Sequence, residues 1–189
     1  MKLHFLKIII SLVLFILFFF RKPKILTFED NDDLVIRGPC FGKVIESKYN
    51  PENNTYTVAI FLSVLDIHWQ LNPIDGQIEK VVYDNTGKFK LAYNLNKSRD
   101  NEKSITTYTV NKNNKEYKLH LYQIAGKVAR RIYTYVKPKD KVKQGKIMGL
   151  IAFGSRVDLV IENGDMFVPN IKLKDRVKGS KTVIGHWKY

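Results

Sequence analysis

Apolar residues are concentrated at the start of the chain and alternate with polar residues after it. Residues 8–20 form a predominantly apolar run of 13, and extending it back to Leu3 gives 18 residues that include His4 and Lys7. As a helix the shorter run would be about 20 Å long, whereas the hydrocarbon layer of a bilayer is about 30 Å thick. The sequence therefore predicts one N-terminal membrane helix, which either spans with its flanks or lies in one leaflet.

The residues that follow this run favour an anchor that stays attached to the chain. Phe20 is followed by Arg21-Lys22-Pro23-Lys24, with no small-residue motif for signal cleavage. A cleaved signal peptide and a buried core helix are the alternatives. Basic residues beside a membrane helix favour anionic headgroups and the cytoplasmic side. We therefore expect an anchor over residues 1–22, a linker over 23–33, and a domain on the cytoplasmic side of a membrane.

From residue 34 onward, short runs of β-branched and aromatic residues alternate with turn-forming sequences. Two segments that begin with Asn-Pro, residues 50–54 and 72–76, have the composition of turns. The pattern predicts a mainly β domain with antiparallel sheets over residues 34–189. The predicted strands cover residues 34–36, 42–45, 56–62, 77–83, 117–124 and 128–136, and residues 97–103 and 111–115 are predicted loops.

Two segments near the C-terminus resemble one another. Residues 139–149 and 174–185 each place an acidic residue directly before a basic-Val pair, then a glycine, then branched residues ending in a second glycine. This arrangement is typical of the paired hairpins in lipoyl-like and biotinyl-like β-sandwiches, although the hairpin tip that carries the modified lysine of those carriers is not evident. We therefore expect lipoyl-like barrel-sandwich hairpins, with two similar hairpins in another β-domain as the alternative.

The chain is strongly basic, mainly in its C-terminal part. The formal net charge is +14, of which residues 101–189 carry +12. Such a surface attracts anionic lipid headgroups, nucleic acids or acidic proteins. We expect no nucleic-acid partner, because the lysines are spread over hairpins, no nucleic-acid motif is present and the chain carries an anchor. The single Cys40 allows no internal disulfide, and no metal site is predicted.

A dipeptide that can cleave itself lies in the segment Phe153-Gly154-Ser155-Arg156-Val157-Asp158. The Ser155 hydroxyl can attack the Gly154 carbonyl, shift the acyl group from nitrogen to oxygen, and then lose the ester by elimination. The new chain end becomes a pyruvoyl group. Glycine suits this reaction because it has no side chain to block attack and tolerates strained dihedrals. An ordinary Gly-Ser turn is the alternative.

Six segments carry a pattern that runs through nearly the whole chain in order. They are Phe-Phe-Arg-Lys-Pro at 19–23, Gly-Pro-Cys-Phe-Gly-Lys-Val at 38–44, Leu-Ser-Val-Leu-Asp-Ile-His at 62–68, Asn-Glu at 101–102, Gln-Ile-Ala-Gly-Lys-Val-Ala-Arg-Arg-Ile at 123–132 and Gly-Leu-Ile-Ala-Phe-Gly-Ser-Arg-Val-Asp at 149–158. In this order they resemble the phosphatidylserine decarboxylase family, in particular its small membrane-anchored bacterial type. The last segment is similar to the family's self-cleavage region.

The resemblance implies pyruvoyl-dependent decarboxylation of phosphatidylserine to phosphatidylethanolamine. Ser155 would become the pyruvoyl cofactor after cleavage at Gly154–Ser155, which leaves a small subunit of residues 155–189. His68 would activate the Ser155 hydroxyl and later transfer a proton. Asp66 lies two residues before His68, so on a strand the two side chains would share a face.

The resemblance also implies partners for the chain. The substrate would be a phospholipid, the chain would bind an anionic membrane surface, and the small subunit would stay bound to the large one. Of the adjacent Arg130 and Arg131, which would alternate between faces of a strand, one could pair with the substrate phosphate or carboxylate. A solvated charge is the alternative at these arginines. Homo-oligomerisation is left open.

One position departs from the family pattern. Phe41 stands where the family has the Asp of Pro-Ala-Asp-Gly, which is understood to work with the histidine, and Asp66 would have to stand in for it. Loss of the orienting acid alone can leave slow chemistry. Three hypotheses follow: a membrane-anchored decarboxylase, an unprocessed and catalytically impaired homologue that binds anionic lipid, and a membrane-tethered adaptor with a lipoyl-like sandwich.

Overall fold

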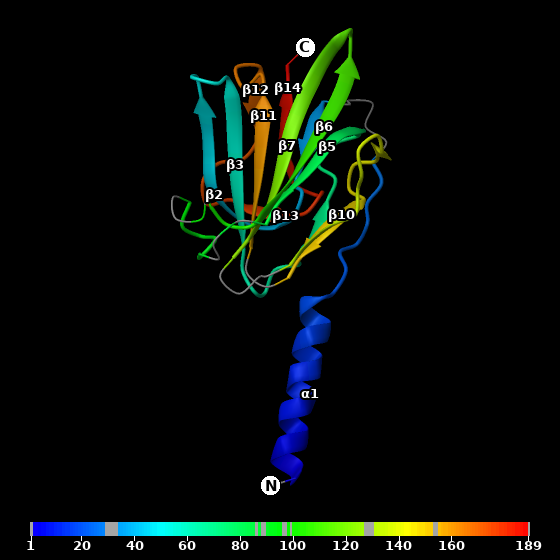
Figure 1. The fold of residues 1–189 in the computed structure, drawn as a ribbon, viewed down its shortest axis with the longest axis vertical. Helices are drawn as coiled ribbons and strands as arrows, with labels where there is room; N and C mark the ends of the chain where they lie inside the picture. The colour runs from blue at the N-terminus through cyan, green and yellow to red at the C-terminus, as the bar shows by residue number, and fades with distance from the viewer. Residues whose placement is uncertain are drawn as a thin grey trace.

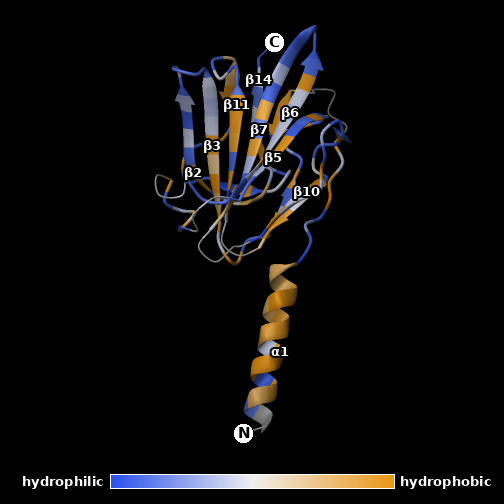
Figure 2. Ribbon diagram, viewed as in Figure 1, coloured by the Kyte–Doolittle hydropathy of each residue, from blue (hydrophilic) through white to orange (hydrophobic). Residues whose placement is uncertain are grey.

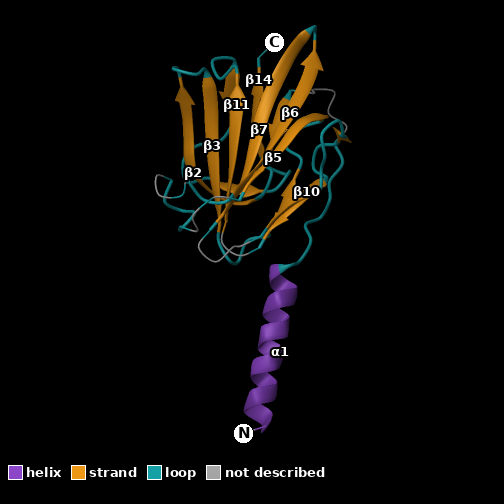
Figure 3. Cartoon of the chain, in the orientation of Figure 1, coloured by secondary structure: helices purple, strands orange, loops and turns teal. Residues whose placement is uncertain are grey.

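The structure, a computed structural model, describes residues 2–28, 34–85, 87, 90–95, 98, 100–126, 131–152 and 155–188. These residues form one helix followed by fourteen strands (Figures 1 and 3). The helix is α1 (Lys2–Phe19). The strands are β1 (Val35–Arg37), β2 (Phe41–Asn50), β3 (Thr55–Leu62), β4 (Trp69–Leu71), β5 (Gly76–Asp84), β6 (Lys103–Lys112), β7 (Lys115–Ala125), β8 (Ile132–Thr134), β9 (Lys141–Val142), β10 (Ile147–Ile151), β11 (Ser155–Glu162), β12 (Phe167–Pro169), β13 (Arg176–Lys178) and β14 (Val183–Trp187).

Helix α1 projects from the β-domain as an apolar rod (Figure 2). Large apolar side chains between Phe5 and Phe18 are exposed, whereas Phe19 is buried against the domain. Over the described residues, no helix meets both the length and the hydropathy that crossing a membrane requires. The predicted N-terminal helix is confirmed as a helix, and its insertion into a membrane stays a prediction.

The β-domain is antiparallel, as the sequence pattern predicted. Its main sheet curls into a half-barrel with the strand order β13-β2-β3-β11-β7-β6-β5-β9, and two three-stranded sheets have the orders β1-β14-β12 and β4-β10-β8 (Figure 1). The apolar core includes Tyr108 from β6, Leu159 from β11 and Trp187 from β14, which are all buried. Alternating buried and partly exposed positions along β7 and β11 give each strand one core-facing side.

The strand order shows that the domain is built from two corresponding halves. Counting inward from each edge of the main sheet, β13 corresponds to β9, β2 to β5, β3 to β6 and β11 to β7. The two small sheets correspond in the same way, β1-β14-β12 to β4-β10-β8. We call β4–β10 the inner half, because the chain inserts it between β3 and β11, and we call β1–β3 with β11–β14 the outer half.

Backbone hydrogen bonds match between the halves. The Arg37 amide donates to the Pro73 carbonyl at 2.8 Å, and the corresponding Leu71 amide donates to the Pro39 carbonyl at 2.7 Å. The segment Pro39-Cys40-Phe41-Gly42 of the outer half therefore corresponds to Pro73-Ile74-Asp75-Gly76 of the inner half.

The repeat seen in the sequence is confirmed as one turn used twice. Lys139 and Lys174 both have a positive φ, of 75° and 77°, which is uncommon for a residue with a side chain. The Lys139 amide donates to the Ile78 carbonyl at 2.7 Å, and the Lys174 amide donates to the Val44 carbonyl at 3.0 Å. These turns lead into β9 and β13, which lie at opposite edges of the main sheet. The lipoyl-like classification itself stays a prediction.

Strands β6 and β11 were not among the strands that the sequence pattern predicted. The inward face of β6 carries Ser104 and Thr106 as well as Tyr108 and Val110, so polar residues hide the alternation. Residues 128–130 of a predicted strand lie outside the described residues, and the described remainder contains β8.

Candidate active site

Ser155 opens a central strand at the end of the domain from which α1 projects (Figure 1). In register it lies between Leu62 at the end of β3 and Ala125 at the end of β7. The side chain is fully buried, and its hydroxyl has no hydrogen-bond partner among the described residues. A buried hydroxyl without a partner costs about 1–3 kcal/mol, so this position carries a polar group that packing alone does not explain.

Asn101 holds the neighbouring end of β7 in place. Its amide nitrogen donates to the Ala125 carbonyl and to the Lys90 carbonyl, at 2.7 Å each, and its amide oxygen accepts from the Lys90 amide at 2.9 Å. The amide of Ala125 donates to the Glu102 carbonyl at 2.9 Å. The Asn-Glu element of the sequence thus fixes the backbone beside Ser155.

His68 precedes β4 and is fully buried. Its Nδ1 atom lies 2.9 Å from the backbone carbonyl oxygen of Asp66, while its Nε2 atom has no hydrogen-bond partner among the described residues. A carbonyl oxygen only accepts, so the proton of the neutral ring resides on Nδ1. Nε2 is therefore left with a lone pair and is the basic atom of the ring.

Burial lowers the pKa of His68 from its ordinary value near 6.5 to about 4. The Asp66 carbonyl and carboxylate raise this pKa, and the nearby Arg21 guanidinium lowers it, but loss of hydration is the largest effect. The imidazole is therefore neutral at neutral pH. A neutral ring with a free Nε2 can accept a proton, as a general base must.

Helix α1 ends directly on this histidine. The Phe19 ring, fully buried, lies 4.2 Å from the His68 ring between centroids. The Trp69 indole donates to the Phe20 carbonyl at 3.1 Å, and the Arg21 guanidinium donates to the Leu65 carbonyl at 2.7 Å. The last turn of the apolar helix thus forms one wall of the site.

The prediction that Asp66 and His68 share one face of a strand is wrong. Residues 63–68 form a turn, because the Asp66 carboxylate accepts from the Ser63 amide at 2.9 Å and from the Ser63 hydroxyl at 2.8 Å. Its other oxygen accepts from Arg176 at 2.7 Å. The carboxylate is therefore engaged away from the imidazole, and Asp66 contacts His68 through its main-chain carbonyl.

The other predicted site residues are placed only in part. Gly154 and Arg130 lie outside the described residues, so the structure describes the candidate scissile bond only on its Ser155 side. Arg131 has an exposed side chain, and its carbonyl accepts from the Ala152 amide at 3.3 Å. Arg131 therefore lies beside the segment that leads into Ser155.

Two buried polar pairs near Ser155, Arg156 with Asp158 and Gln123 with Gln70, were missed in the sequence. The Arg156 guanidinium pairs with Asp158 at 2.9 Å and donates to the Ser98 hydroxyl at 2.6 Å. Burial raises the pKa of Asp158 to about 6, although Arg156 opposes the change. The Gln123 amide donates to the Gln70 side chain at 2.9 Å. The available signal was a charged pair spaced by two inside an apolar strand, which puts both side chains on one face.

Comparisons with known proteins agree on one family. A family model described as phosphatidylserine decarboxylase matches residues 13–185. The chain is 37% identical over 193 residues to a phosphatidylserine decarboxylase proenzyme of Cytophaga hutchinsonii, with 95% of this chain and 81% of that protein covered. It is 33% identical over 186 residues to the proenzyme of Carboxydothermus hydrogenoformans, with 96% and 84% covered. No solved structure matches the chain.

Proposed function

The chain belongs to the phosphatidylserine decarboxylase family, whose members are carboxy-lyases, and we propose that it converts phosphatidylserine to phosphatidylethanolamine and CO2 after cleaving itself at Gly154–Ser155. The observation that carries this proposal is the fully buried Ser155 hydroxyl, which has no hydrogen-bond partner among the described residues. Both relatives are proenzymes, a word that denotes a precursor.

In the proposed cleavage, the Ser155 oxygen attacks the Gly154 carbonyl carbon and the peptide C–N bond breaks, so that an ester replaces the amide. Loss of the Ser155 α-proton then breaks the ester C–O bond, which leaves Gly154 with a carboxylate. Water hydrolyses the resulting enamine and ammonia leaves, so the new chain end carries a pyruvoyl group. Because β11 pairs with β3 and β7, and β14 pairs with β1, residues 155–189 remain bound after cleavage.

His68 is the proposed proton-transfer residue. Its Nε2 lone pair accepts the hydroxyl proton of Ser155, and the Asp66 carbonyl holds the ring in the tautomer that leaves Nε2 free. The pKa of about 4 keeps the ring unprotonated at neutral pH but makes it a weak base. Since Phe41 replaces the family's Asp and the Asp66 carboxylate is held by Ser63 and Arg176, we expect slow cleavage.

The residues present fit a pyruvoyl group, because the Ser155 side chain supplies the atoms of that group and its hydroxyl has no hydrogen-bond partner among the residues that the structure describes. Once formed, the group supplies an electron sink for loss of CO2 from the serine headgroup. The chain's own contribution is positioning and proton transfer. Arg131, and Arg130 outside the described residues, are proposed to bind the substrate phosphate or carboxylate.

We assign α1 the role of a membrane anchor that brings the site to its lipid substrate. The exposed apolar side chains of α1 would be covered by lipid, and the site begins where the helix ends, at Phe19 and His68. The basic segment after the helix places the domain on the cytoplasmic side in this proposal.

Intact-mass analysis of the expressed full-length protein, with Ser155→Ala as the control, tests the proposal. Wild type is expected to release a fragment of residues 155–189 with an amine-free terminus, and Ser155→Ala is expected to stay a single chain. Headspace CO2 from carboxyl-labelled phosphatidylserine should appear with wild type alone. A single uncleaved chain in wild type and in Phe41→Asp would contradict the decarboxylase.

Phe41 supports a second candidate function, in which the chain stays uncleaved and acts as a membrane-anchored module for anionic lipid. An aromatic ring at this position cannot orient an imidazolium, so the serine would be poorly activated. In that case lipid binding survives Ser155→Ala, whereas a decarboxylase loses its activity in the same variant.

A further inference from the structure

A basic pocket lies beside the end of α1, on the side of the domain that carries His68. It has a volume of about 340 Å³, and we define it by Lys22 and Lys24 after the helix and by Lys178 and Lys181 at and after β13. Phe41 and Ile67 add apolar walls. All four lysines are exposed, and no acidic residue is among the described residues that line the pocket.

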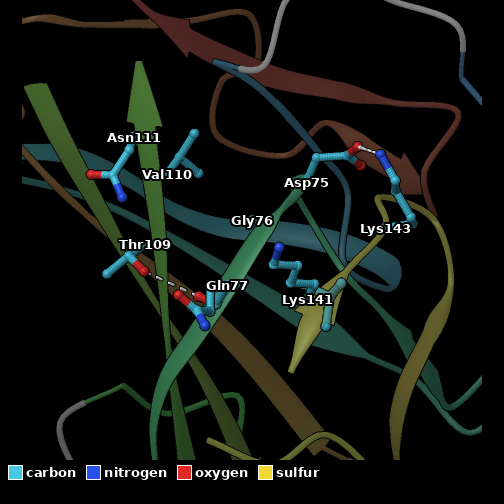
Figure 4. A pocket seen from close by; sticks show the side chains of 9 residues that line it. Asp75, Gly76, Gln77, Thr109, Val110, Asn111, Lys141 and Lys143 are labelled. Atoms are coloured by element: carbon cyan, nitrogen blue, oxygen red, sulfur yellow. Dashed lines mark hydrogen bonds and ion pairs between the residues drawn. The ribbon is translucent and has the colours of Figure 1, made fainter. Parts of the chain in front are cut away.

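The inner half shows what is missing from this pocket. There, the Asp75 carboxylate accepts from the Lys143 ammonium at 2.6 Å and from the Gln144 backbone amide at 2.6 Å. Figure 4 shows the side chains of Asp75 and Lys143 pointing toward one another. Phe41 occupies the position that corresponds to Asp75, and Lys178 occupies the position that corresponds to Lys143. The outer half thus repeats a lysine site with its carboxylate replaced by an aromatic ring.

We propose that the basic pocket binds the phosphate group of an anionic phospholipid in the leaflet that holds α1. Ammonium groups bind phosphate as point charges, and basic residues next to an anionic bilayer are attracted to its headgroups. Phe41 and Ile67 offer apolar surface to the glycerol backbone of the same lipid. The Lys22 ammonium already lies 5.4 Å from the Trp69 ring centre, which keeps that side of the pocket close to the helix end.

This inference rests on the proposed membrane placement of α1 but not on decarboxylation. A lipid that lacks an amine, such as phosphatidylglycerol, can fill the pocket without being a substrate. The pocket therefore binds anionic lipid whether the chain is a decarboxylase or an uncleaved lipid-binding module. The pocket would also recruit free phosphate by the same chemistry, so the two sources have to be separated by experiment.

Binding is measured by titrating phosphatidylglycerol in dodecylmaltoside micelles into the full-length chain and following tryptophan fluorescence and heat. All proteins carry Ser155→Ala, so that differences in cleavage cannot affect the result. The pocket variant is Lys178→Gln with Lys181→Gln. The matched control is Lys48→Gln with Lys115→Gln, which removes the same charge from exposed positions on β2 and β7 toward the far end of the domain (Figure 1).

We expect the pocket variant to weaken phosphatidylglycerol binding about 30-fold, which corresponds to two lysine contacts of about 1 kcal/mol each. The control variant should change it less than about 2-fold, and phosphatidylcholine should not bind at the site. Phe41→Asp should weaken binding as well, because it supplies the missing carboxylate next to Lys178.

Equal weakening in the pocket and control variants would overturn the proposal, since it would mean attraction to net charge alone. If inorganic phosphate displaces phosphatidylglycerol with an affinity equal to that of the lipid, the pocket is a site for free anions and not for lipid. Circular dichroism must show the β-domain intact in each variant. If the Ser155→Ala protein binds phosphatidylglycerol while the wild-type chain stays uncleaved in the intact-mass experiment, the decarboxylase is refuted and the pocket assignment stands.

Discussion

The two halves of the domain share a backbone but differ in chemistry at corresponding positions. Before β1, Leu34 is fully buried and its carbonyl accepts from the Trp187 amide at 3.3 Å. Before β4, His68 is fully buried and its carbonyl accepts from the Ile151 amide at 3.2 Å. At the position where the outer half has a leucine, the inner half therefore has an imidazole whose Nε2 has no hydrogen-bond partner among the described residues.

The second difference runs the other way. In the inner half, Asp75 accepts hydrogen bonds from Lys143 and from the Gln144 backbone amide. In the outer half, Phe41 packs against Gly179, where an added Cβ would lie 2.5 Å from the ring. The backbone of a repeat is maintained by the hydrogen bonds the halves share. A residue that lowers stability in one copy, and that the shared architecture does not require, is expected to be kept for function.

The largest effect is expected when His68 is made to match its counterpart, with His68→Leu. Cleavage should fall about 1,000-fold or more, because the base is lost. The free energy of unfolding at neutral pH should rise by about 1–3 kcal/mol, since the substitution removes a buried nitrogen that has no hydrogen-bond partner within the described part of the chain. Mass spectrometry of the cleaved fraction and chemical denaturation measure the two effects.

His120 is the matched control for that substitution. Its Nδ1 lies 3.0 Å from the Thr107 hydroxyl and its Nε2 lies 2.8 Å from Glu162, so both ring nitrogens have partners. His120→Leu should lower stability and leave cleavage unchanged. Equal loss of cleavage in both variants would remove the distinction between the two histidines.

Wild type and His68→Leu should also differ in how their stability depends on pH. The folded pKa of His68 is about 4 and its ordinary value is 6.5, so between these values the unfolded chain binds more protons than the folded one. Wild type should therefore lose up to about 3 kcal/mol relative to His68→Leu as pH falls from 6.5 to 4. Asp158, whose raised pKa gives the opposite slope, is present in both proteins and cancels in the difference. Parallel stability curves would show that burial does not perturb the ring.

A smaller effect is expected when the outer half receives the acid of the inner half, with Phe41→Asp. Cleavage should rise about 10- to 100-fold, because a carboxylate near the imidazole stabilises its protonated form. Asp75→Asn is the control, since it alters the corresponding acid at the other copy and should leave the cleavage rate unchanged. Time courses of fragment appearance after expression at low temperature give both rates. Unchanged cleavage in Phe41→Asp would mean that position 41 does not reach the histidine.

The smallest of these effects concerns the contact between α1 and the site. Phe19→Ala should let water reach His68 and raise its pKa by about one unit. Carbon-13 NMR of labelled histidine in detergent measures the titration. Leu12→Ala, at an exposed position of the same helix, should leave the pKa of His68 as it is. If the two variants titrate alike, α1 is an anchor without influence on the site.

Much of the fold could be predicted from local sequence because it rests on local chemistry. The apolar run forms α1, the β-branched and aromatic run at residues 56–62 forms most of β3, and the Lys-Asp repeat forms the same turn at Lys139 and Lys174. Ser155 and His68 were singled out as candidate site residues because they lie in contiguous motifs. Strand β6 was missed because its buried face is partly polar, and burial of polar groups depends on partners elsewhere in the chain.

The sequence by itself determined which reactive groups are present and which local segments carry them. Only the tertiary structure decided how they are used, because burial and long-range pairing depend on where other segments pack. The Asp66 carboxylate was expected beside His68, but the turn at Ser63 and the arrival of Arg176 from β13 direct it elsewhere. Phe19 covers His68 because a helix end and a loop 49 residues later meet in space. The correspondence of Phe41 with Asp75 likewise emerges from matching hydrogen bonds, since the two tetrapeptides share only their proline and glycine.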